Sequence, residues 1–280
     1  MTVSTDLVIQ GPRLADAQAE ALASLCRARG WRRLGPGAAR LADATPDPRL
    51  EAECARMRLD YAFVPAQARL SDFGLVAMDM DSTLITIECI DELATLAGIG
   101  PEVAEITERA MRGEIEFAES FTRRLALLAD LDASALERVW TERLKLNDGA
   151  DRLIEGLRLR GIKTLLVSSG FSFFTERLKS RLHLDYAVSN QPEIAAGKLT
   201  GRIVGTILDA NGKAETVRRL RSELGLAQEQ VIVMGDGAND LAMMAEAGVS
   251  IAFRAKPVVL QQATYGFLHV GLDGLLNLFL

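Results

Sequence analysis

The chain has 280 residues, of which 49% are hydrophobic, and its formal net charge is −6. This length exceeds that of one typical domain, and the hydrophobic content is sufficient for a large buried core. The acidic balance argues against nonspecific binding of nucleic acid, which needs a basic surface. The three cysteines, at positions 26, 54 and 89, are too few and too scattered for a disulfide framework or a zinc site.

The sequence also lacks the signals of a secreted or membrane protein. No stretch approaches the ~18 uninterrupted apolar residues of a membrane span, and the N-terminal segment has no basic start followed by an apolar run. We therefore predict a cytoplasmic protein with neither a membrane nor a nucleic acid as its partner.

Residues 1–70 are predicted to form a small α+β domain. The pattern indicates strands and helices in the order βαββαβ, with strands at 5–10, 31–34, 39–41 and 61–64 and helices at 15–29 and 49–57. This order is typical of a ferredoxin-like or ACT-like domain, in which helices cover an antiparallel sheet. No catalytic pattern stands out here. A packing or dimerisation role, which would give a homodimer, and a regulatory amino-acid-binding role both stay open.

Residues 74–280 are predicted to form a larger α/β domain. Its first strand, at 75–79, is an apolar run that fits a parallel sheet covered on both faces. A helical segment at about 90–146 is expected to lie over the strand ends as a cap. Strands and helices then alternate, which predicts a doubly wound, Rossmann-like, mostly parallel sheet. The later strands are expected at 162–167, 231–234, 250–253 and 267–270, with antiparallel hairpins at 186–206.

Three of these strands end in polar residues, and the carboxyl ends of parallel strands meet at one edge of a sheet. The first strand ends at Asp79 and Asp81, the second at Ser168-Ser169-Gly170 and the third at residues 235–240, GDGAND. Each motif alone has a simpler explanation, because Asp-x-Asp is often a turn or helix cap and a Gly-rich run is often a tight turn. Together, and each after its own strand, they are specific.

The residue types at these strand ends favour chemistry on a phosphate. Asp79 and Asp236 supply the hard oxygen ligands that Mg²⁺ prefers. The hydroxyl and backbone N–H groups of residues 168–170 can hold an anion. Lys213 is the cation that we expect against the phosphate, with Asp240 holding its ammonium in position.

This set of motifs resembles the haloacid-dehalogenase-type phosphatases over residues 75–280. The resemblance implies that Asp79 attacks phosphorus to form an aspartyl-phosphate, while Asp81 protonates the leaving alcohol and later takes a proton from water. It also implies a Mg²⁺ held by Asp79, the backbone carbonyl of Asp81 and Asp236, and a substrate contact from Asn239. Ser169 departs from the family, which commonly has Gly there, although its backbone N–H is retained.

The cap run resembles that of family members that act on phosphoserine. Its residues are 110–113 (AMRG), Phe117, Ser120 and Arg124. The resemblance implies that Glu88 binds the substrate ammonium, that Arg124 binds its carboxylate, and that Met111 and Phe117 form pocket walls. Taken without it, Arg124 is a solvated helix charge, and Met111 and Phe117 are core residues.

The expected function is hydrolysis of O-phospho-L-serine to L-serine and phosphate, the last step of serine biosynthesis. The alternatives are the same chemistry on another small phosphate, such as phosphothreonine or phosphohomoserine, and transfer to an alcohol. A further alternative gives the N-terminal domain the role of an amino-acid sensor.

Overall fold

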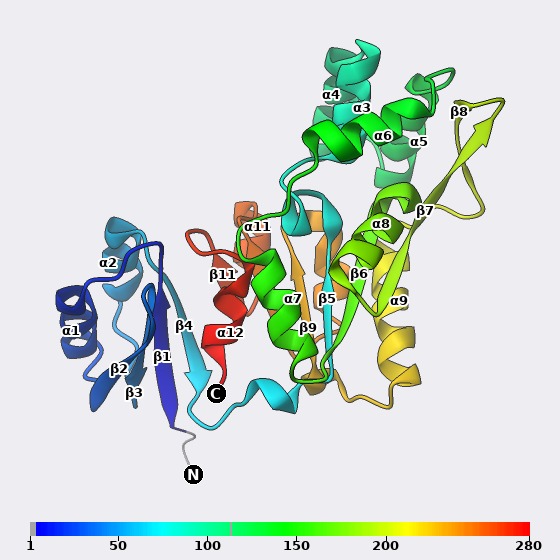
Figure 1. Ribbon diagram of the computed structural model, residues 1–280. Coiled ribbons are helices and arrows are strands. Elements are labelled where there is room, and N and C mark those ends of the chain that lie inside the picture. Colours follow the sequence, from blue (N-terminus) through cyan, green and yellow to red (C-terminus); the bar gives the residue numbers. More distant parts are fainter. Residues whose placement is uncertain (1–3, 113) are drawn as a thin grey trace.

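The computed structural model describes residues 4–112 and 114–280, with the side chain of Met111 outside the description, and contains two sheets that lie side by side (Figure 1). The predicted fold class is confirmed. Among the described residues, no helix is both long and apolar enough to cross a bilayer.

The N-terminal sheet is antiparallel, with the strand order β2-β3-β1-β4. Side chains alternate across β1, so Leu7 and Ile9 pack against the two helices while Val8 joins the core of the larger unit. The first helix ends earlier than predicted, because Arg27 has a φ of 52° and leaves the right-handed helical region. The elements are β1 (Thr5–Gln10), α1 (Asp16–Leu25), β2 (Gly30–Gly35), β3 (Ala38–Ala42), α2 (Leu50–Met57) and β4 (Asp60–Pro65).

The larger sheet has the strand order β11-β10-β9-β5-β6-β7-β8. β8 pairs with β7 in antiparallel orientation, and the other neighbouring strands are parallel. The apolar strand β5 lies at its centre and is fully buried, as its unbroken apolar run predicts. The strands are β5 (Leu75–Met78), β6 (Lys163–Phe171), β7 (Tyr186–Ala195), β8 (Lys198–Val204), β9 (Val231–Gly235), β10 (Val249–Phe253) and β11 (Tyr265–Phe267).

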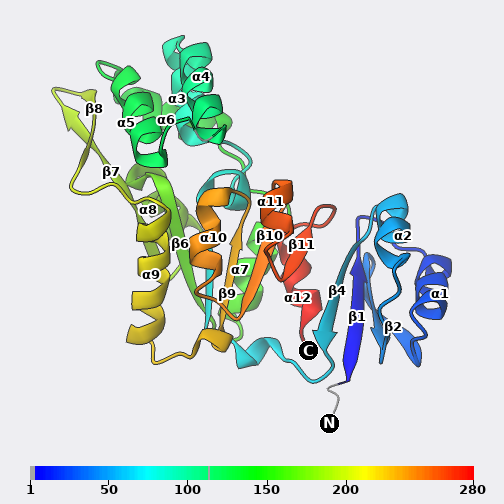
Figure 2. The same cartoon turned by 180° about the vertical axis from the view of Figure 1, so that it is seen from behind.

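Helices cover both faces of this sheet (Figure 2). Val76 and Met78 of β5 join the core beneath α7, α8 and α12, whereas Leu75 and Ala77 join the core beneath α9, α10 and α11. The helices are α7 (Ala150–Arg158), α8 (Ser172–Leu182), α9 (Ala210–Glu223), α10 (Leu241–Met244), α11 (Pro257–Leu260) and α12 (Leu275–Leu278).

The predicted helical cap lies beyond the carboxyl ends of the strands (Figure 1). The β7–β8 hairpin reaches up to it: the Leu199 N–H donates to the Leu131 carbonyl at 2.9 Å, and the Asp130 N–H donates to the Leu199 carbonyl at 2.9 Å. The cap is therefore joined to the sheet by backbone hydrogen bonds as well as by its two connecting segments. Its helices are α3 (Cys89–Ala97), α4 (Gly100–Met111), α5 (Phe117–Leu127) and α6 (Ser134–Arg138).

The prediction of a strand at 267–270 is wrong, because β11 is Tyr265–Phe267. The buried carboxylate of Asp60, on β4, accepts hydrogen bonds from the backbone N–H groups of Leu268, His269 and Val270 at 2.9, 2.9 and 3.0 Å. These three N–H groups therefore bond to an acid of the N-terminal sheet and not to a neighbouring strand. The same contact fastens the two sheets together.

Candidate active site

Asp79 follows the central strand β5 and begins a tight turn over residues 80–84. Its Oδ1 accepts a hydrogen bond from the Met80 N–H at 2.7 Å. Within the turn Ser82 has a φ of 55°, a left-handed conformation that reverses the chain. Asp81 is thereby directed back to the strand ends, where its Oδ1 accepts the Cys89 N–H at 2.9 Å.

Lys213 is buried in the first turns of α9 and holds two carboxylates. Its Nζ donates to Asp79 Oδ1 at 2.8 Å and to Asp240 Oδ1 at 2.9 Å. The other oxygen of Asp240 accepts the N–H groups of Asp236 and Gly237 at 3.1 and 3.0 Å. Both Asp240 oxygens are therefore engaged, and this residue orients Lys213 and the loop after β9.

Asp79, Asp236 and Asp240 form an acidic cluster in which the oxygens that could hold a metal lie within 4.8 Å of one another. Both oxygens of Asp240 are engaged, one by Lys213 and the other by two N–H groups, whereas the hydrogen bonds described for Asp79 and Asp236 use only Oδ1, so these two acids are the better candidates for metal ligands. Thr83 fixes Asp236 by donating to its Oδ1 at 2.7 Å. This hard-oxygen donor set fits a divalent cation.

The charges of the cavity also favour cationic ligands. Burial, followed by repulsion from Asp240, raises the pKa of Asp79 well above its usual value, and burial raises the pKa of Asp236 to about 6. Burial alone would lower the pKa of Lys213, but Asp240 and Asp79 outweigh that effect and raise it. A cation beside Asp79 and Asp236 would relieve their repulsion.

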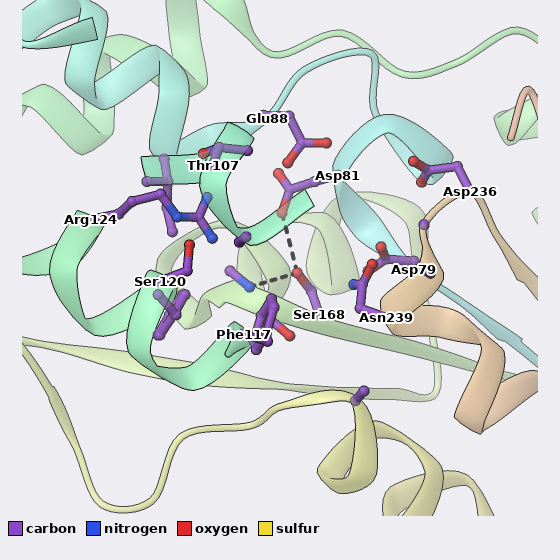
Figure 3. A pocket seen from close by; sticks show the side chains of 18 of the residues that line it. Asp79, Asp81, Glu88, Thr107, Phe117, Ser120, Arg124, Ser168, Asp236 and Asn239 are labelled. Carbon is purple, nitrogen blue, oxygen red and sulfur yellow. Dashed lines mark hydrogen bonds between the residues drawn. The ribbon is translucent and has the colours of Figure 1, made fainter. Parts of the chain in front are cut away.

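The last residues of β6 supply hydroxyl and N–H groups beside Asp81. Ser168 donates from its hydroxyl to Asp81 Oδ2 at 3.4 Å and accepts the Gly170 N–H at 2.9 Å (Figure 3). A Cβ on Gly170 would lie 2.9 Å from Asp81 Oδ2, so a side chain at this position would displace the Asp81 carboxylate. β6 continues through residues 168–170 to Phe171 instead of ending at 167 as predicted.

The cap faces these strand ends across a cavity of about 530 Å³. Arg124, Ser120 and Phe117, all from α5, lie on one side; Asp79 and Asp236 lie on the other (Figure 3).

Glu88 lies at the start of α3 and faces the same cavity. Its Oε1 accepts the Ser82 hydroxyl at 2.6 Å. Burial raises the pKa of Glu88 to about 7, and Asp81 adds to the effect. Burial lowers the pKa of Arg124.

The structure brings most of the predicted site residues to this one cavity. Two predicted residues are not among those lining it: Asp240 is fully buried and bonds to Lys213, and the side chain of Met111 is outside the described residues. The predicted residues that line it are Asp79, Asp81, Glu88, Phe117, Arg124, Ser168, Ser169, Gly170, Lys213, Asp236 and Asn239.

Sequence reasoning missed residues that support or line the site. Asn147 donates from Nδ2 to the carbonyls of Thr83 and Ile85 at 2.9 and 3.0 Å, which fixes the turn after Asp79. Nothing in the local sequence signals this distant contact. Asp91, in the first turn of α3, also lines the cavity. Asp91 follows Glu88 by three residues, and this spacing, which makes the two side chains neighbours on a helix, was the sequence signal for it.

Comparison with known proteins agrees with this geometry. The family model for haloacid dehalogenase-like hydrolases matches residues 73–248, and the chain belongs to this family. A second match, to a domain of unknown function, covers residues 7–51.

Relatives that match about three quarters of this chain include proteins named phosphoserine phosphatase. One from Polaromonas sp. is 50% identical over 215 residues, covering 75% of this chain and 91% of the relative. The crystal structure of a probable phosphoserine phosphatase from Vibrio cholerae has a TM-score of 0.86 at 37% identity and covers 99% of this chain and 86% of that one. A substrate-bound phosphoserine phosphatase complex has a TM-score of 0.69 at 37% identity over 73% of this chain and 97% of that one.

Proposed function

We propose that this protein is a Mg²⁺-dependent phosphatase that hydrolyses O-phospho-L-serine to L-serine and phosphate in the cytoplasm, as the last step of serine biosynthesis. The observation that carries the proposal is one cavity with two different ends. Asp79, Lys213 and Ser168 line its sheet end, and Glu88 and Arg124 line its cap end. The first set suits a phosphoryl group and the second suits an α-amino acid.

In the proposed reaction an oxygen of Asp79 attacks phosphorus, and the bond from phosphorus to the serine oxygen breaks. Asp81 gives its proton to that leaving oxygen, which requires the protonated acid that burial favours by raising its pKa. Water then attacks the aspartyl-phosphate and loses a proton to Asp81, which restores Asp79. Two easier displacements replace one difficult step.

Lys213 and the loop of residues 168–170 are proposed to hold the transferring phosphoryl oxygens. The Lys213 ammonium already lies 2.8 Å from Asp79 Oδ1, beside the attacking atom. Donors aimed at developing charge in a closed site act more strongly than they do in water. Asn239, which also lines the cavity, adds an amide at the same end.

Asp79, Asp236 and the backbone carbonyl of Asp81 would hold the Mg²⁺ of this proposal. When bound, the ion supplies positive charge that offsets the phosphate and its acidic surroundings. Of the residues described, five acids and three bases line the cavity, so an anionic substrate needs such a cation. The acids are Asp79, Asp81, Glu88, Asp91 and Asp236, and the bases are Arg124, Lys213 and Lys256.

Removing the metal is expected to abolish activity and to lower stability. A chelator should stop phosphate release, and Mg²⁺ should restore it, because the buried carboxylates need a cation between them and the phosphate. Mg²⁺ should also raise the melting temperature, since a ligand that binds only the folded state stabilises it. Asp236→Asn should require at least about tenfold more Mg²⁺ for both effects. Full activity in excess chelator would contradict this metal role.

Replacing Arg124 is expected to weaken recognition of the amino-acid carboxylate. A guanidinium grips a carboxylate through two parallel charge-assisted hydrogen bonds, so Arg124→Met should lower kcat/KM for phosphoserine about a hundredfold. Arg123→Met is the matched control on the same helix, because Arg123 is exposed and pairs with Glu119. The measurement is steady-state kinetics. If kcat/KM for phosphoserine equals that of wild type in both variants, Arg124 does not bind the substrate.

The substrate itself is tested by measuring phosphate release from O-phospho-L-serine, phosphothreonine and phosphohomoserine, with and without an added alcohol acceptor. We expect phosphoserine to have the highest kcat/KM and water to be the acceptor. A higher kcat/KM for another phosphate, or net transfer to the alcohol, would favour the alternative function.

We also propose that residues 1–70 and 74–280 are separate domains and that the first acts in packing or in formation of a homodimer. Support comes from its buried contacts with the larger unit, in which Tyr265 donates to the Phe63 carbonyl at 3.1 Å and Asp60 accepts three N–H groups. Sedimentation of the full chain tests the dimer. Calorimetry with L-serine tests the alternative, an amino-acid sensor, which predicts binding that survives when the active site is blocked.

A further inference from the structure

The cavity contains buried polar atoms that have no hydrogen-bond partner within the protein. Among the residues that the structure describes, five such side-chain atoms occur, and four belong to residues that line this cavity. An unpaired buried polar group is costly and calls for an explanation, such as a ligand that is absent. The four atoms are Asp91 Oδ1, Ser120 Oγ, Arg124 Nε and Ser169 Oγ.

Ser120 is the member of this set that is most deeply buried and has no assigned role. Only 1% of the residue is exposed, yet its hydroxyl finds no partner. The hydroxyl of a buried helical serine or threonine usually has a partner, because it donates to the backbone carbonyl four residues earlier. In the part of the chain that the structure describes, six helical hydroxyls do so, those of Thr95, Thr107, Thr122, Thr141, Thr216 and Ser222.

Two neighbours of Ser120 show the contrast directly. Thr107 also lines the cavity, but its hydroxyl donates to the Val103 carbonyl at 3.0 Å. Thr122, on the same helix as Ser120, donates to the Ala118 carbonyl at 2.8 Å. The carbonyl four residues before Ser120, that of Glu116, accepts its backbone N–H at 2.9 Å but not its hydroxyl. The hydroxyl of Ser120, a residue that lines the cavity, is thus left without a hydrogen-bond partner within the protein.

The position of Ser120 identifies the ligand group that it can reach. Ser120 and Arg124 are four residues apart on α5, so their side chains lie on one face of the helix, and both lie on the same side of the cavity (Figure 3). Arg124 forms no ion pair within 4 Å among the described residues, and its Nε is unpaired. The Arg124 guanidinium interacts electrostatically with Asp91 without forming an ion pair, so together with the Ser120 hydroxyl it suits an anion. Glu88, which directly precedes α3, suits a cation.

We propose that Ser120 is a substrate-binding residue whose hydroxyl donates a second hydrogen bond to the substrate carboxylate held by Arg124. This inference rests on the proposed function and names a contact that selects substrates bearing a carboxylate. The hydroxyl is left unpaired in the free protein and gains its partner when the amino acid binds. Ser120 takes no part in the transfer of the phosphoryl group.

The experiment compares Ser120→Ala with wild type on two phosphates. O-phospho-L-serine carries the carboxylate, whereas O-phosphoethanolamine keeps the ammonium and the phosphate but lacks the carboxylate. We expect the KM for phosphoserine to rise about tenfold or more, as for loss of a hydrogen bond to a charged group, with kcat changed less than about twofold. The kcat/KM or inhibition constant for phosphoethanolamine should be unchanged.

Two further measurements separate the possible outcomes. Thr122→Ala, which removes an exposed hydroxyl from the same helix, should match wild type with both phosphates. The melting temperature of ligand-free Ser120→Ala should equal or exceed that of wild type, because an unpaired buried group is removed. An unchanged KM for phosphoserine, equal losses on both phosphates or a clearly lower melting temperature would overturn the inference. If wild type itself fails to hydrolyse phosphoserine, the proposed function fails first and this inference with it.

Discussion

Asp79→Asn is expected to lower kcat for phosphoserine by at least about 10⁴-fold, the scale seen when a nucleophile is removed from a site that acts as a unit. The amide is nearly the same size as the carboxylate, so packing around β5 should survive. An amide nitrogen is not a nucleophile towards phosphorus and carries no charge for Lys213 or a cation. The measurement is steady-state phosphate release, with the melting temperature checked for each variant.

The control for this variant is Asp151→Asn. Asp151 is exposed in the first turn of α7 and lies away from the cavity, so its removal should leave kcat unchanged. A kcat for Asp79→Asn within about tenfold of wild type would show that another group, or water itself, attacks phosphorus.

Lys213→Met is expected to damage both folding and catalysis. The Lys213 side chain is 1% exposed and lies between Asp79 and Asp240, which are 8% and 0% exposed. Removing one partner of a buried ion pair leaves an uncompensated charge and costs about 3–5 kcal/mol in the free energy of unfolding. The loss of a donor to the phosphoryl group should lower kcat at least about 10²–10³-fold in the protein that still folds.

Lys163→Met is the matched control, because Lys163 also holds an aspartate but does so at the surface. Its Nζ lies 2.6 Å from Asp185 Oδ1, and the two side chains are 47% and 29% exposed. Exposed pairs contribute about 0–1 kcal/mol, so urea denaturation should separate the two variants clearly. Similar small losses for both would contradict the role given to the buried cluster.

The sequence was sufficient to predict the fold class because its signals were local. The unbroken apolar run of β5 indicates a buried parallel strand. The polar residues at the carboxyl ends of β5, β6 and β9 indicate a ligand site, because ligands of parallel sheets bind beyond these strand ends. The resemblance to the family added Glu88 and Arg124; without it, the sequence pattern predicts that Arg124 is a solvated helix charge. These residues come from α3 and α5 and meet only through the packing of the cap.

The features that sequence reasoning missed depend on tertiary contacts. Asp60 accepts hydrogen bonds from three N–H groups that follow β11, so this strand ends earlier than predicted. The two segments are about two hundred residues apart in the sequence. Asn147 stabilises the turn after Asp79 through hydrogen bonds, and no local sequence motif predicts this contact. The buried hydroxyl of Ser120 has no hydrogen-bond partner within the protein, and this can be recognised only in the packed structure.

The most direct test of the proposed chemistry is to trap the phosphoryl group on the protein. Enzyme mixed with radiolabelled phosphoserine and quenched in acid within one turnover should carry the label on the peptide that contains Asp79, and Asp79→Asn should carry none. Phosphate release without any labelled protein, or label on a peptide that lacks Asp79, would contradict the account.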